Sequence, residues 1–514
     1  MSYPVDFASH DGVLDVNLSF RNFLDAAGQM RYCYLSDDGN QSPTLRVHPG
    51  DLLVLHLRNN VTLRSQRNAA DEAIMADACA SRTMSEAATN LHFHGLTIPP
   101  ICHQDDTLRT LIEPKDPSFE YRIRIPRDQV PGLYWYHPHA HGLSEAQVLG
   151  GASGALIVEG IERANRLVTG LPERVIVIRD QKVASPLVDP KKPGKDLSLN
   201  FVPVPYPDYP PASIKMKPGE RQLWRVLNAS AITYLNLAVL FGHTPQQLGL
   251  VAIDGVPMNT PQGRSPPLTW VNHIGVPPGA RVEFVMTGPP AGVQGLFVTR
   301  TVDTGQGGEN DPNRALASLI AAGDAPEPQS KLPVSSTPLP TPARPWLGDV
   351  RPVRVRRFYF SEKLENPKDP NSATAFYITE DGRTPAPFDP QATAPNIVVQ
   401  QGDVEDWIIE NRSTELHAFH IHQIHFMLMD WTGMPVNEPF LRDTVNVPYY
   451  SDRMLQYPSV RLRMDFRDPN TIGTFVYHCH LLEHEDGGMM GTIRVEAAHA
   501  PAVSAKLESE PVTN

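Results

Sequence analysis

The chain has 514 residues, of which 41% are hydrophobic and 20% charged, and its formal net charge at pH 7 is -12. This acidic balance argues against nucleic-acid binding and favours solubility, and no apolar run approaches the length needed to cross a membrane. The 51 Pro and 35 Gly residues favour many short strands joined by turns over long helices. At roughly 100 to 200 residues per domain, the length predicts three domains.

Two sequence elements recur three times along the chain. The first begins at Val47, Met216 and Val399, and each copy opens an apolar, strand-like run that ends in Asn, at Asn59, Asn228 and Asn411. The second begins at Gly132, Gly295 and Gly473. Repeats spaced by about 165 to 185 residues fit tandem whole domains. We therefore predict three copies of one all-β sandwich, with domains at 1–163, 164–324 and 346–514 and a Pro-rich linker at 325–345.

Histidines gather in short clusters at both ends of the chain. In chain order these are His92-Phe93-His94-Gly95, His137-Pro138-His139 and His417-Ala418-Phe419-His420-Ile421-His422. In an extended strand, residues two apart share a face, so a single His-X-His often arises by chance. Several such clusters together indicate a metal site formed where the first and last parts of the chain meet.

The densest set of ligands lies between His478 and Met489. A Cys thiolate, two imidazoles and a weak axial Met suit a one-electron copper centre, and Cys479, His484 and Met489 supply three of these four. If the run from Thr474 to His480 is extended, Cys479 points to one face while His478 and His480 point to the other. One strand would then contact two metal sites.

The motifs HFHG, HPH, HAFHIH and HCHLLEHEDGGM resemble, in order and spacing, the copper-binding motifs of the multicopper oxidases, the laccase and bilirubin oxidase group. The resemblance runs from about residue 45 to the C-terminus. It implies three cupredoxin-like Greek-key β-sandwich domains and four copper ions. The implied ligands are His417, Cys479, His484 and axial Met489 for type 1 copper, His92 and His420 for type 2, and His94, His137 and His480 with His139, His422 and His478 for the coupled type 3 pair.

The middle copy of the repeat lacks these ligands. It has Tyr234 where the third copy has His417, and Arg300 where its sister copies have His137 and His478. We therefore expect the middle domain to space and shape the other two domains.

The resemblance also implies acidic residues that deliver protons to the buried oxygen site. Asp106 and Glu485 are the candidates, and Asp105 is an alternative to Asp106 because the alignment around Pro99–Gln104 is uncertain. A carboxyl group near a buried site can relay protons. The competing interpretation makes both residues ordinary solvated acids.

Three cysteines remain besides Cys479. A disulfide between Cys79 and Cys102 would pin the insertion 61–90, where we expect a short helix, beside the copper site if the compartment is oxidising. Residues 1–15 carry no secretory signal. Since many bacterial relatives are exported, a periplasmic or secreted location is expected if a signal has been removed.

The resemblance implies a laccase-like activity, in which one-electron oxidation of phenols, aromatic amines or bilirubin-like donors is coupled to four-electron reduction of O2 to water. The alternative is a cuprous or other metal-ion oxidase in copper homeostasis. Such enzymes often carry a Met-rich insert, and the 14 Met residues here are dispersed. We expect a monomer whose partners are a small reducing molecule and O2.

Overall fold

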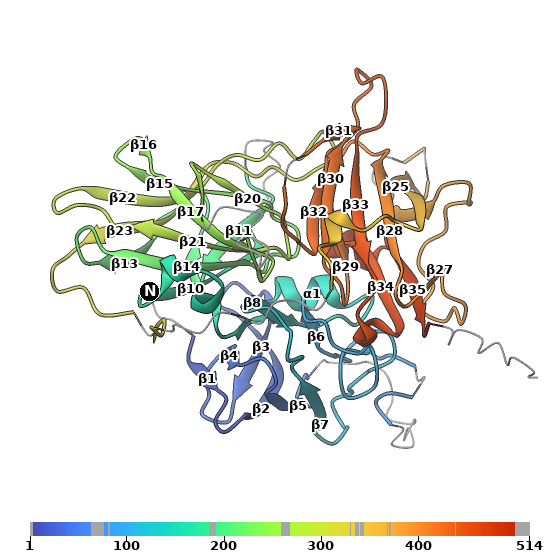
Figure 1. Ribbon diagram of the computed structural model, residues 1–514, viewed down its shortest axis with the longest axis horizontal. Helices are drawn as coiled ribbons and strands as arrows, with labels where there is room; N and C mark the ends of the chain where they lie inside the picture. The colour runs from blue at the N-terminus through green and yellow to red at the C-terminus, as the bar shows by residue number, and fades with distance from the viewer. Residues whose placement is uncertain are drawn as a thin grey trace, which may run out of the picture.

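The computed structural model is built almost entirely from short β-strands, which form three lobes in chain order (Figure 1). It describes residues 4–498 except 63–76, 81–82, 184–191, 259–267, 329, 335–338, 340–343, 367, 370–371 and 437. Within these residues each lobe contains two sheets around its own hydrophobic core. The all-β prediction is therefore confirmed.

The first lobe shows why these sequences form strands. In β2 (Val13–Leu24), Leu14, Val16 and Leu18 are buried while Asp15 and Asn17 between them are exposed, the alternation of a strand with one face on a core. One sheet of this lobe has the order β3 (Met30–Ser36), β2, β5 (Leu52–Asn59), β7 (Phe119–Arg124), and the other has the order β1 (Asp6–Ala8), β4 (Thr44–Val47), β9 (Gly154–Val158), β8 (Gly132–His137), β6 (His92–His94).

The second lobe has the same two-sheet design. Its larger sheet has the order β12 (Val202–Val204), β11 (Lys195–Leu199), β10 (Pro172–Lys182), β14 (Arg221–Asn228), β21 (Arg281–Thr287), β17 (Leu248–Ile253), β18 (Val256–Pro257), with β19 (Thr269–Val271) on β17 and β24 (Ser330–Lys331) on β10. Its other sheet has the order β13 (Ala212–Met216), β23 (Arg314–Ala321), β22 (Gln294–Thr299), β15 (Leu235–Phe241), β16 (Thr244–Pro245), with β20 (Ile274–Val276) on β15.

The third lobe carries the C-terminal motifs. One sheet has the order β26 (Thr374–Glu380), β25 (Arg354–Leu364), β28 (Val404–Asn411), β33 (Ser459–Asp465), β30 (Phe426–Trp431), β31 (Met434–Pro435), and the other has the order β27 (Ile397–Gln400), β35 (Met490–Glu496), β34 (Gly473–Cys479), β29 (His417–Ile421), β32 (Thr444–Val447). The helical elements of the described chain are short: α1 (Ser144–Leu149), α2 (Ile161–Ala164), α3 (Leu482–Asp486) and the 3-10 turns η1 (Arg166–Val168), η2 (Leu347–Asp349) and η3 (Pro469–Thr471).

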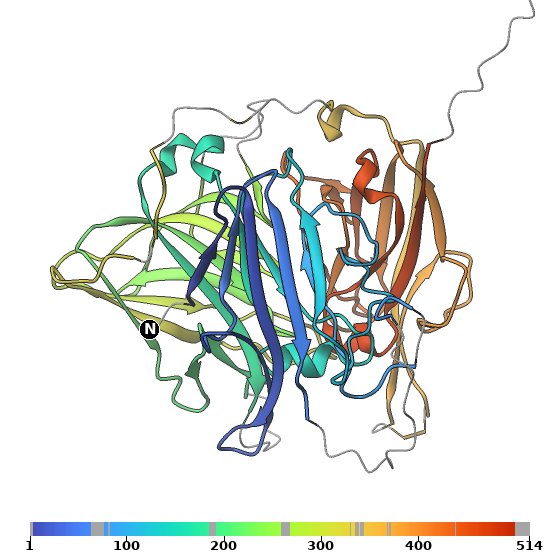
Figure 2. The same cartoon turned by 90° about the horizontal axis from the view of Figure 1, so that it is seen from below.

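The three lobes meet around α1. Figure 1 shows the first lobe (blue) beneath the junction of the second (green) and third (orange), and Figure 2 shows its strands crossing between them. Helix α1 contacts α3 of the third lobe and β10 of the second. A buried cluster also joins the first two lobes, through Leu133, Trp135, Ala155 and Ile157 on one side and Val175, Val177, Leu227 and Ala229 on the other.

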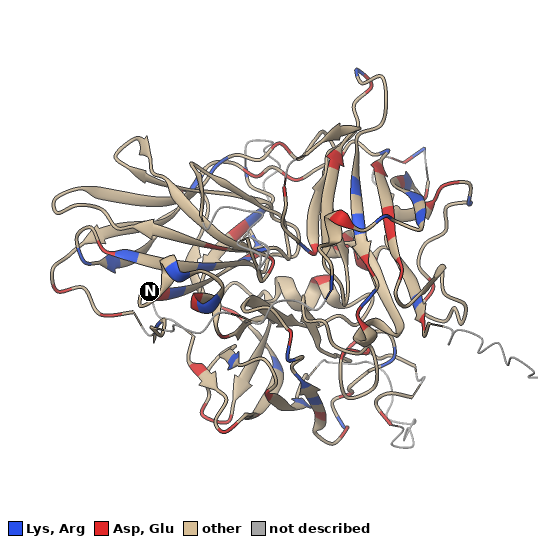
Figure 3. Cartoon of the chain, in the orientation of Figure 1, with Lys and Arg blue, Asp and Glu red and all other residues tan. Residues whose placement is uncertain are grey.

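Three further predictions concern the connections and the surface. Part of the expected linker is anchored, because Ser330 and Lys331 pair with β10 and Leu332 is buried. The short helix expected within 61–90 falls largely on residues 63–76 and 81–82, outside the described residues. None of the helices in the described ranges is long and apolar enough to span a bilayer. Acidic and basic residues are interspersed over all three lobes (Figure 3).

Candidate metal centre

One thiol and two imidazoles meet inside the third lobe. Cys479 ends β34, His417 begins the neighbouring antiparallel strand β29, and His484 lies in α3 just after β34. Cys479 Sγ lies 3.5 Å from His417 Nδ1 and 3.9 Å from His484 Nδ1, and the two Nδ1 atoms are 3.2 Å apart. All three side chains are buried.

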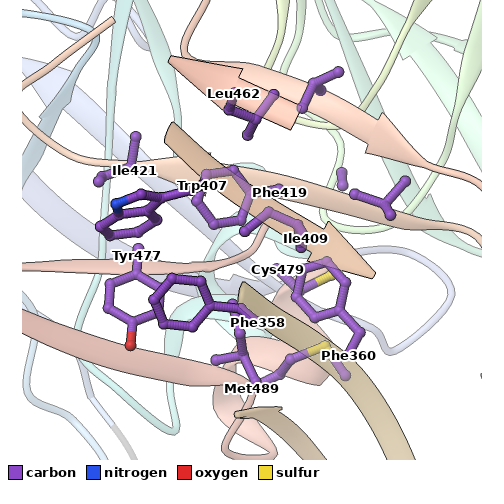
Figure 4. Close-up of a cluster of buried hydrophobic side chains, with 14 of the residues drawn as sticks. Phe358, Phe360, Trp407, Ile409, Phe419, Ile421, Leu462, Tyr477, Cys479 and Met489 are labelled. Carbon is purple, nitrogen blue, oxygen red and sulfur yellow. The ribbon is translucent and has the colours of Figure 1, made fainter. Parts of the chain in front are cut away.

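Met489 lies in the same buried core (Figure 4). Gly488, with φ 109°, turns the chain after α3. The Met489 N–H then donates to the His484 carbonyl at 2.8 Å, and the Met489 carbonyl accepts from the Cys479 N–H at 3.1 Å. These two bonds hold Met489 beside both residues. We call His417, Cys479, His484 and Met489 the type 1 group.

Eight further histidines form a buried cluster between the first and third lobes, which we call the histidine cluster. Three groups within it have one possible ligand atom per residue, all within 4.8 Å of one another. Each group combines histidines of both lobes. The groups are His92, His94 and His420; His94, His137 and His480; and His139, His422 and His478.

Strand pairing brings these histidines together. His92 of β6 lies opposite His137 of β8, and His420 of β29 lies opposite His478 of β34. Because successive side chains of a strand point to opposite faces, β34 directs Cys479 into the type 1 group and His478 into the histidine cluster. One strand therefore contacts both groups, as the sequence predicts.

The ring nitrogens of the cluster fit a set of metal ions. Among the described residues, several buried imidazole nitrogens have no hydrogen-bond partner, although a buried polar atom without a partner is normally unfavourable. These atoms are His92 Nε2, His94 Nδ1, His137 Nε2, His420 Nε2, His422 Nδ1 and both ring nitrogens of His480. Bound cations would satisfy these atoms.

The protonation states agree with this interpretation. Burial, reinforced by neighbouring imidazoles, lowers the pKa of His478 to about 3. Lowered pKa values are found for His94, His137, His139, His420, His422, His480 and His484 as well. Neutral imidazole is the form that binds metals. Burial also raises the pKa of the Cys479 thiol, and a coordinated metal ion would deprotonate it.

Comparison with known proteins decides the family. Sequence models of multicopper oxidase domains match residues 82–163 and 365–499, which contain all twelve residues of the two groups. The chain belongs to the multicopper oxidase family. It is 24% identical over 461 residues to the multicopper oxidase mco of Staphylococcus aureus, covering 88% of this chain and 81% of the relative. It is 21% identical over 456 residues to the laccase of Bacillus subtilis, covering 80% and 81%.

The fold agrees with this family. The structure of a multicopper oxidase from Campylobacter jejuni, described as a metallo-oxidase, superposes with a TM-score of 0.68 at 24% identity, covering 96% of this chain and 94% of that one. The three lobes are therefore cupredoxin-like sandwiches. Multicopper oxidases are copper-dependent oxidoreductases that use O2, and the type 1 group and the histidine cluster are the residues that fit copper here.

In this multicopper oxidase the carboxylate that contacts the first histidine motif, His92-Phe93-His94, belongs to Asp105. Both Asp105 carboxylate oxygens lie 3.0 Å from His92 Nδ1, and Asp105 also accepts from the Phe93 N–H at 2.9 Å. Asp106, the residue the sequence favoured, instead pairs with Arg109 at 2.9 Å. The structure thus brings the alternative residue, Asp105, to the histidine cluster. Successive residues in a loop point in different directions, and the local spacing could not distinguish them.

Glu485 lies at the histidine cluster. It is fully buried in α3, and its Oε1 accepts from the Ser144 hydroxyl at 3.2 Å and lies 3.6 Å from His139 Nδ1. Its Oε2 has no partner among the described residues. Burial and the nearby Asp486 raise the pKa of Glu485 well above its ordinary value.

Two glutamates border the type 1 group. Glu362 Oε1 lies 3.1 Å from His417 Nε2, and Glu415 Oε2 lies 3.5 Å from His484 Nε2. Burial, together with the negative charges of Glu362, Glu483 and Glu309, raises the pKa of Glu415 to about 9. The Nε2 atoms of His417 and His484 therefore each face a glutamate, and the two glutamates are close enough for their charges to interact.

Gln423 also lies at this site, although no sequence motif marks it. It follows His422 with φ 59°, a conformation that side chains other than Gly and Asn rarely adopt, and its amide donates to Asp105 Oδ2 at 2.5 Å. Nothing in the residue types around it predicts this conformation. Two further histidines near the motifs, His141 and His425, have other contacts: the His141 ring packs edge-on against Phe388, and His425 contacts the Asp254 carbonyl.

Cys79 and Cys102, whose pairing the sequence left open, form a disulfide with a Cα–Cα distance of 5.7 Å. It ties the end of the insertion to the segment just after His92-Phe93-His94. Cys33 is a buried free thiol.

Proposed function

We propose that this protein is a laccase-like oxidase that couples one-electron oxidation of phenols or aromatic amines to the four-electron reduction of O2 to water. The observation that carries the proposal is the position of β34, which places Cys479 in the type 1 group and the flanking His478 and His480 in the histidine cluster. The two sites are therefore joined by the covalent bonds of three consecutive residues.

Four copper ions bound to these residues would supply one-electron acceptance at the type 1 group and multi-electron reduction of O2 at the histidine cluster. The twelve side chains would provide the donors for one copper with sulfur ligands and three with imidazole ligands. The protein supplies the spacing, the burial and the orientation of the rings.

The donor would contact the type 1 group and not the histidine cluster. The outer ring nitrogen of His417 faces Glu362, whose side chain is partly exposed, and that of His484 faces Glu415, which is largely buried. Electron transfer at such an edge does not require a close fit, which suits a range of small aromatic donors.

We assign the delivery of protons to Asp105 and Glu485. Each is buried and contacts a histidine of the cluster, Asp105 through His92 and Glu485 through His139. Glu485 Oε2, which is free of hydrogen-bond partners in the described structure, can hold a proton close to the site of oxygen reduction.

The test is to load the full chain with copper and to follow O2 uptake with a phenol, an aromatic amine, bilirubin and Cu(I) as alternative donors. Uptake with the aromatic donors is expected. Cys479→Ser should abolish uptake with every donor while copper remains bound to the histidine cluster. Blue wild-type protein that takes up no O2 with any donor would contradict the proposal.

A metal-ion oxidase is the second candidate, and the crowded glutamates at the type 1 group favour it. A cation docked between Glu362 and Glu415 would relieve the repulsion among these carboxylates. Under this alternative, Glu362→Gln and Glu415→Gln would lower kcat/KM for Cu(I) or Fe(II) far more than for a phenol. Glu496→Gln, at an exposed ion pair with Arg494 in the same lobe, is the matched control.

We also propose that the protein works in an oxidising compartment, periplasmic or extracellular. The Cys79–Cys102 disulfide supports this location, because structural disulfides are rare in reducing compartments. Fractionation of the producing cells, followed by mass spectrometry under non-reducing conditions, tests it. A cytoplasmic protein with both thiols reduced would contradict it.

A further inference from the structure

The middle lobe reaches into the histidine cluster even though it contributes no histidine to it. Gly279, with φ 84°, lies so close to the cluster that a Cβ atom at this position would come within 2.6 Å of His480 Nε2. Two residues later, Arg281 begins β21 and is fully buried. The loop before β21 therefore forms part of the wall of the cluster.

Arg281 forms a bidentate salt bridge with Asp443 of the third lobe. Nη1 donates to Asp443 Oδ1 at 2.8 Å and Nη2 donates to Asp443 Oδ2 at 2.7 Å. The same guanidinium donates to the Leu133 carbonyl of the first lobe at 3.2 Å and to the Asp254 carbonyl of its own lobe at 2.8 Å. One side chain thus joins all three lobes at the edge of the cluster.

Asp443 in turn holds two histidines. Its Oδ1 lies 3.1 Å from His94 Nε2, and its backbone carbonyl lies 2.8 Å from His420 Nδ1. In both rings the nitrogen that faces away from residue 443 is buried and has no hydrogen-bond partner in the described part of the chain, Nδ1 in His94 and Nε2 in His420. Hydrogen bonds to one ring nitrogen fix the tautomer and leave the other nitrogen free for a metal.

The first lobe is shaped around this contact. Gly95 follows His94 directly and has φ 89°, and a Cβ atom there would overlap the Arg281 guanidinium and come within 2.9 Å of Asp443 Oδ2. The glycine of the HFHG motif therefore leaves room for an arginine from a different lobe.

We propose that Arg281 is a positioning residue for copper binding: it holds Asp443 in the one orientation that presents His94 Nδ1 and His420 Nε2 to the histidine cluster. Without Arg281, Asp443 would face the buried carboxylate of Asp254, whose Oδ2 accepts from the Asp443 N–H at 3.1 Å, and the guanidinium that pairs with both carboxylates would be lost. Asp443 would then move, and the two rings would lose their common anchor. This inference assumes that the cluster binds copper, as proposed above.

The test compares two Arg-to-Lys substitutions in the middle lobe of the full-length, copper-loaded protein. Arg281→Lys keeps the positive charge but loses the bidentate salt bridge with Asp443, since only a guanidinium can donate to both oxygens of a carboxylate in this geometry. Arg225→Lys is the matched control: Arg225 is equally buried and paired with Glu173 and Glu283, and neither of these glutamates contacts the histidine cluster. Copper content is measured against increasing chelator, alongside the blue absorption of the type 1 group and the type 2 electron paramagnetic resonance signal.

Arg281→Lys should release the cluster copper at about 10- to 100-fold lower chelator concentration than the wild type, while the blue absorption persists. Arg225→Lys should keep both the wild-type copper retention of the cluster and the blue absorption. Equal release from both variants, or unchanged release from Arg281→Lys, would overturn the proposal. If Arg281→Lys does not fold, Asp443→Asn takes its place, since it keeps the side-chain shape but loses the charge that Arg281 grips, and unchanged copper retention there would equally overturn it. Wild-type protein that binds no copper at the cluster would overturn both this proposal and the copper assignment.

Discussion

Two adjacent methionines differ in their position relative to the type 1 group, and this difference leads to a prediction at the scale of single residues. Met489 is hydrogen-bonded through its backbone to both Cys479 and His484, whereas Met490 begins β35 and pairs with His478. An axial thioether stabilises oxidised copper relative to an aliphatic side chain. Met489→Leu should therefore raise the type 1 reduction potential in a redox titration. Met490→Leu should leave it unchanged, and a fall or no change in Met489→Leu would remove Met489 from the ligand set.

A second residue-scale prediction separates Asp105 from Asp106. Asp105→Asn weakens the anchor on His92 and should lower O2 turnover or copper retention by about 10- to 100-fold. Asp106→Asn disrupts only the ion pair with Arg109, whose side chain is 60% exposed, and should change turnover little. Steady-state O2 uptake and copper content of the two variants provide the measurement. A larger loss in Asp106→Asn would return the role to the residue that the sequence favoured.

Glu485 provides a third test at this scale. Glu485→Gln keeps the hydrogen bond from Ser144 but cannot pass a proton, so it should slow O2 reduction while anaerobic bleaching of the blue colour by a donor proceeds at the wild-type rate. Glu483→Gln, on the exposed side of the same helix, is the control. Loss of bleaching in Glu485→Gln would indicate a structural role instead.

At the scale of elements, the alternation of side chains along a strand was the sequence feature that predicted most of the site. The opposite faces of Cys479 and His478 follow from strand geometry alone, and the observed β34 (Gly473–Cys479) has the predicted extended conformation. The contacts that the sequence did not predict are non-local. Arg281 and Asp443 are 162 residues apart, and Gln423 reaches Asp105 over 318 residues. No local sequence pattern marks either pair, because these residues meet through the packing of different lobes against one another and not through the regular alternation of one strand.

The insertion before the first histidine motif is an element whose stability can be tested. The Cys79–Cys102 disulfide closes a loop with a sequence separation of 23 residues. A loop of this length is expected to add about 3 kcal/mol of stability by restricting the unfolded chain. Cys79→Ser should lower the denaturant midpoint and should make the protein insensitive to reductant. Cys33→Ser, at the buried free thiol, should keep the response to reductant, and equal responses in both variants would exclude a stabilising disulfide.

At the scale of the whole molecule, an ionic network links the first two lobes. Arg46 of β4 and Arg225 of β14 both bind Glu173 of β10, at 2.6 Å. Burial alone would raise the pKa of Glu173, but the two arginines outweigh it and lower the pKa to about 2. Since the folded pKa lies below the unfolded one, this stabilisation is present above about pH 4.5 and is lost as the pH falls toward 2.

Glu173→Gln should therefore destabilise the protein by roughly 3–5 kcal/mol at neutral pH, because it leaves two buried arginines undercompensated. The difference from the wild type should shrink as the pH falls below 4.5 toward 2. Urea unfolding across this pH range measures it. Glu120→Gln, which disrupts an exposed pair with Arg122 at 3.9 Å, should have little effect at any pH. A pH-independent loss in Glu173→Gln would show that packing, not charge, is responsible.

The histidine cluster makes copper a link between the first and third lobes, because each of its three groups takes histidines from both. The type 1 group, in contrast, lies wholly within the third lobe. A ligand that binds only the folded state raises the free energy of unfolding by about 4 kcal/mol when its free concentration is a thousandfold above its dissociation constant. Removing all copper with a chelator should therefore lower Tm and increase proteolysis at the junction of these lobes. Cys479→Ser, which loses only the type 1 copper, should keep most of the wild-type Tm and should still show the large drop on chelation. A drop in Tm that is complete in Cys479→Ser before chelation would place the stabilising copper in the third lobe alone, and the histidine cluster would then not hold the two lobes together.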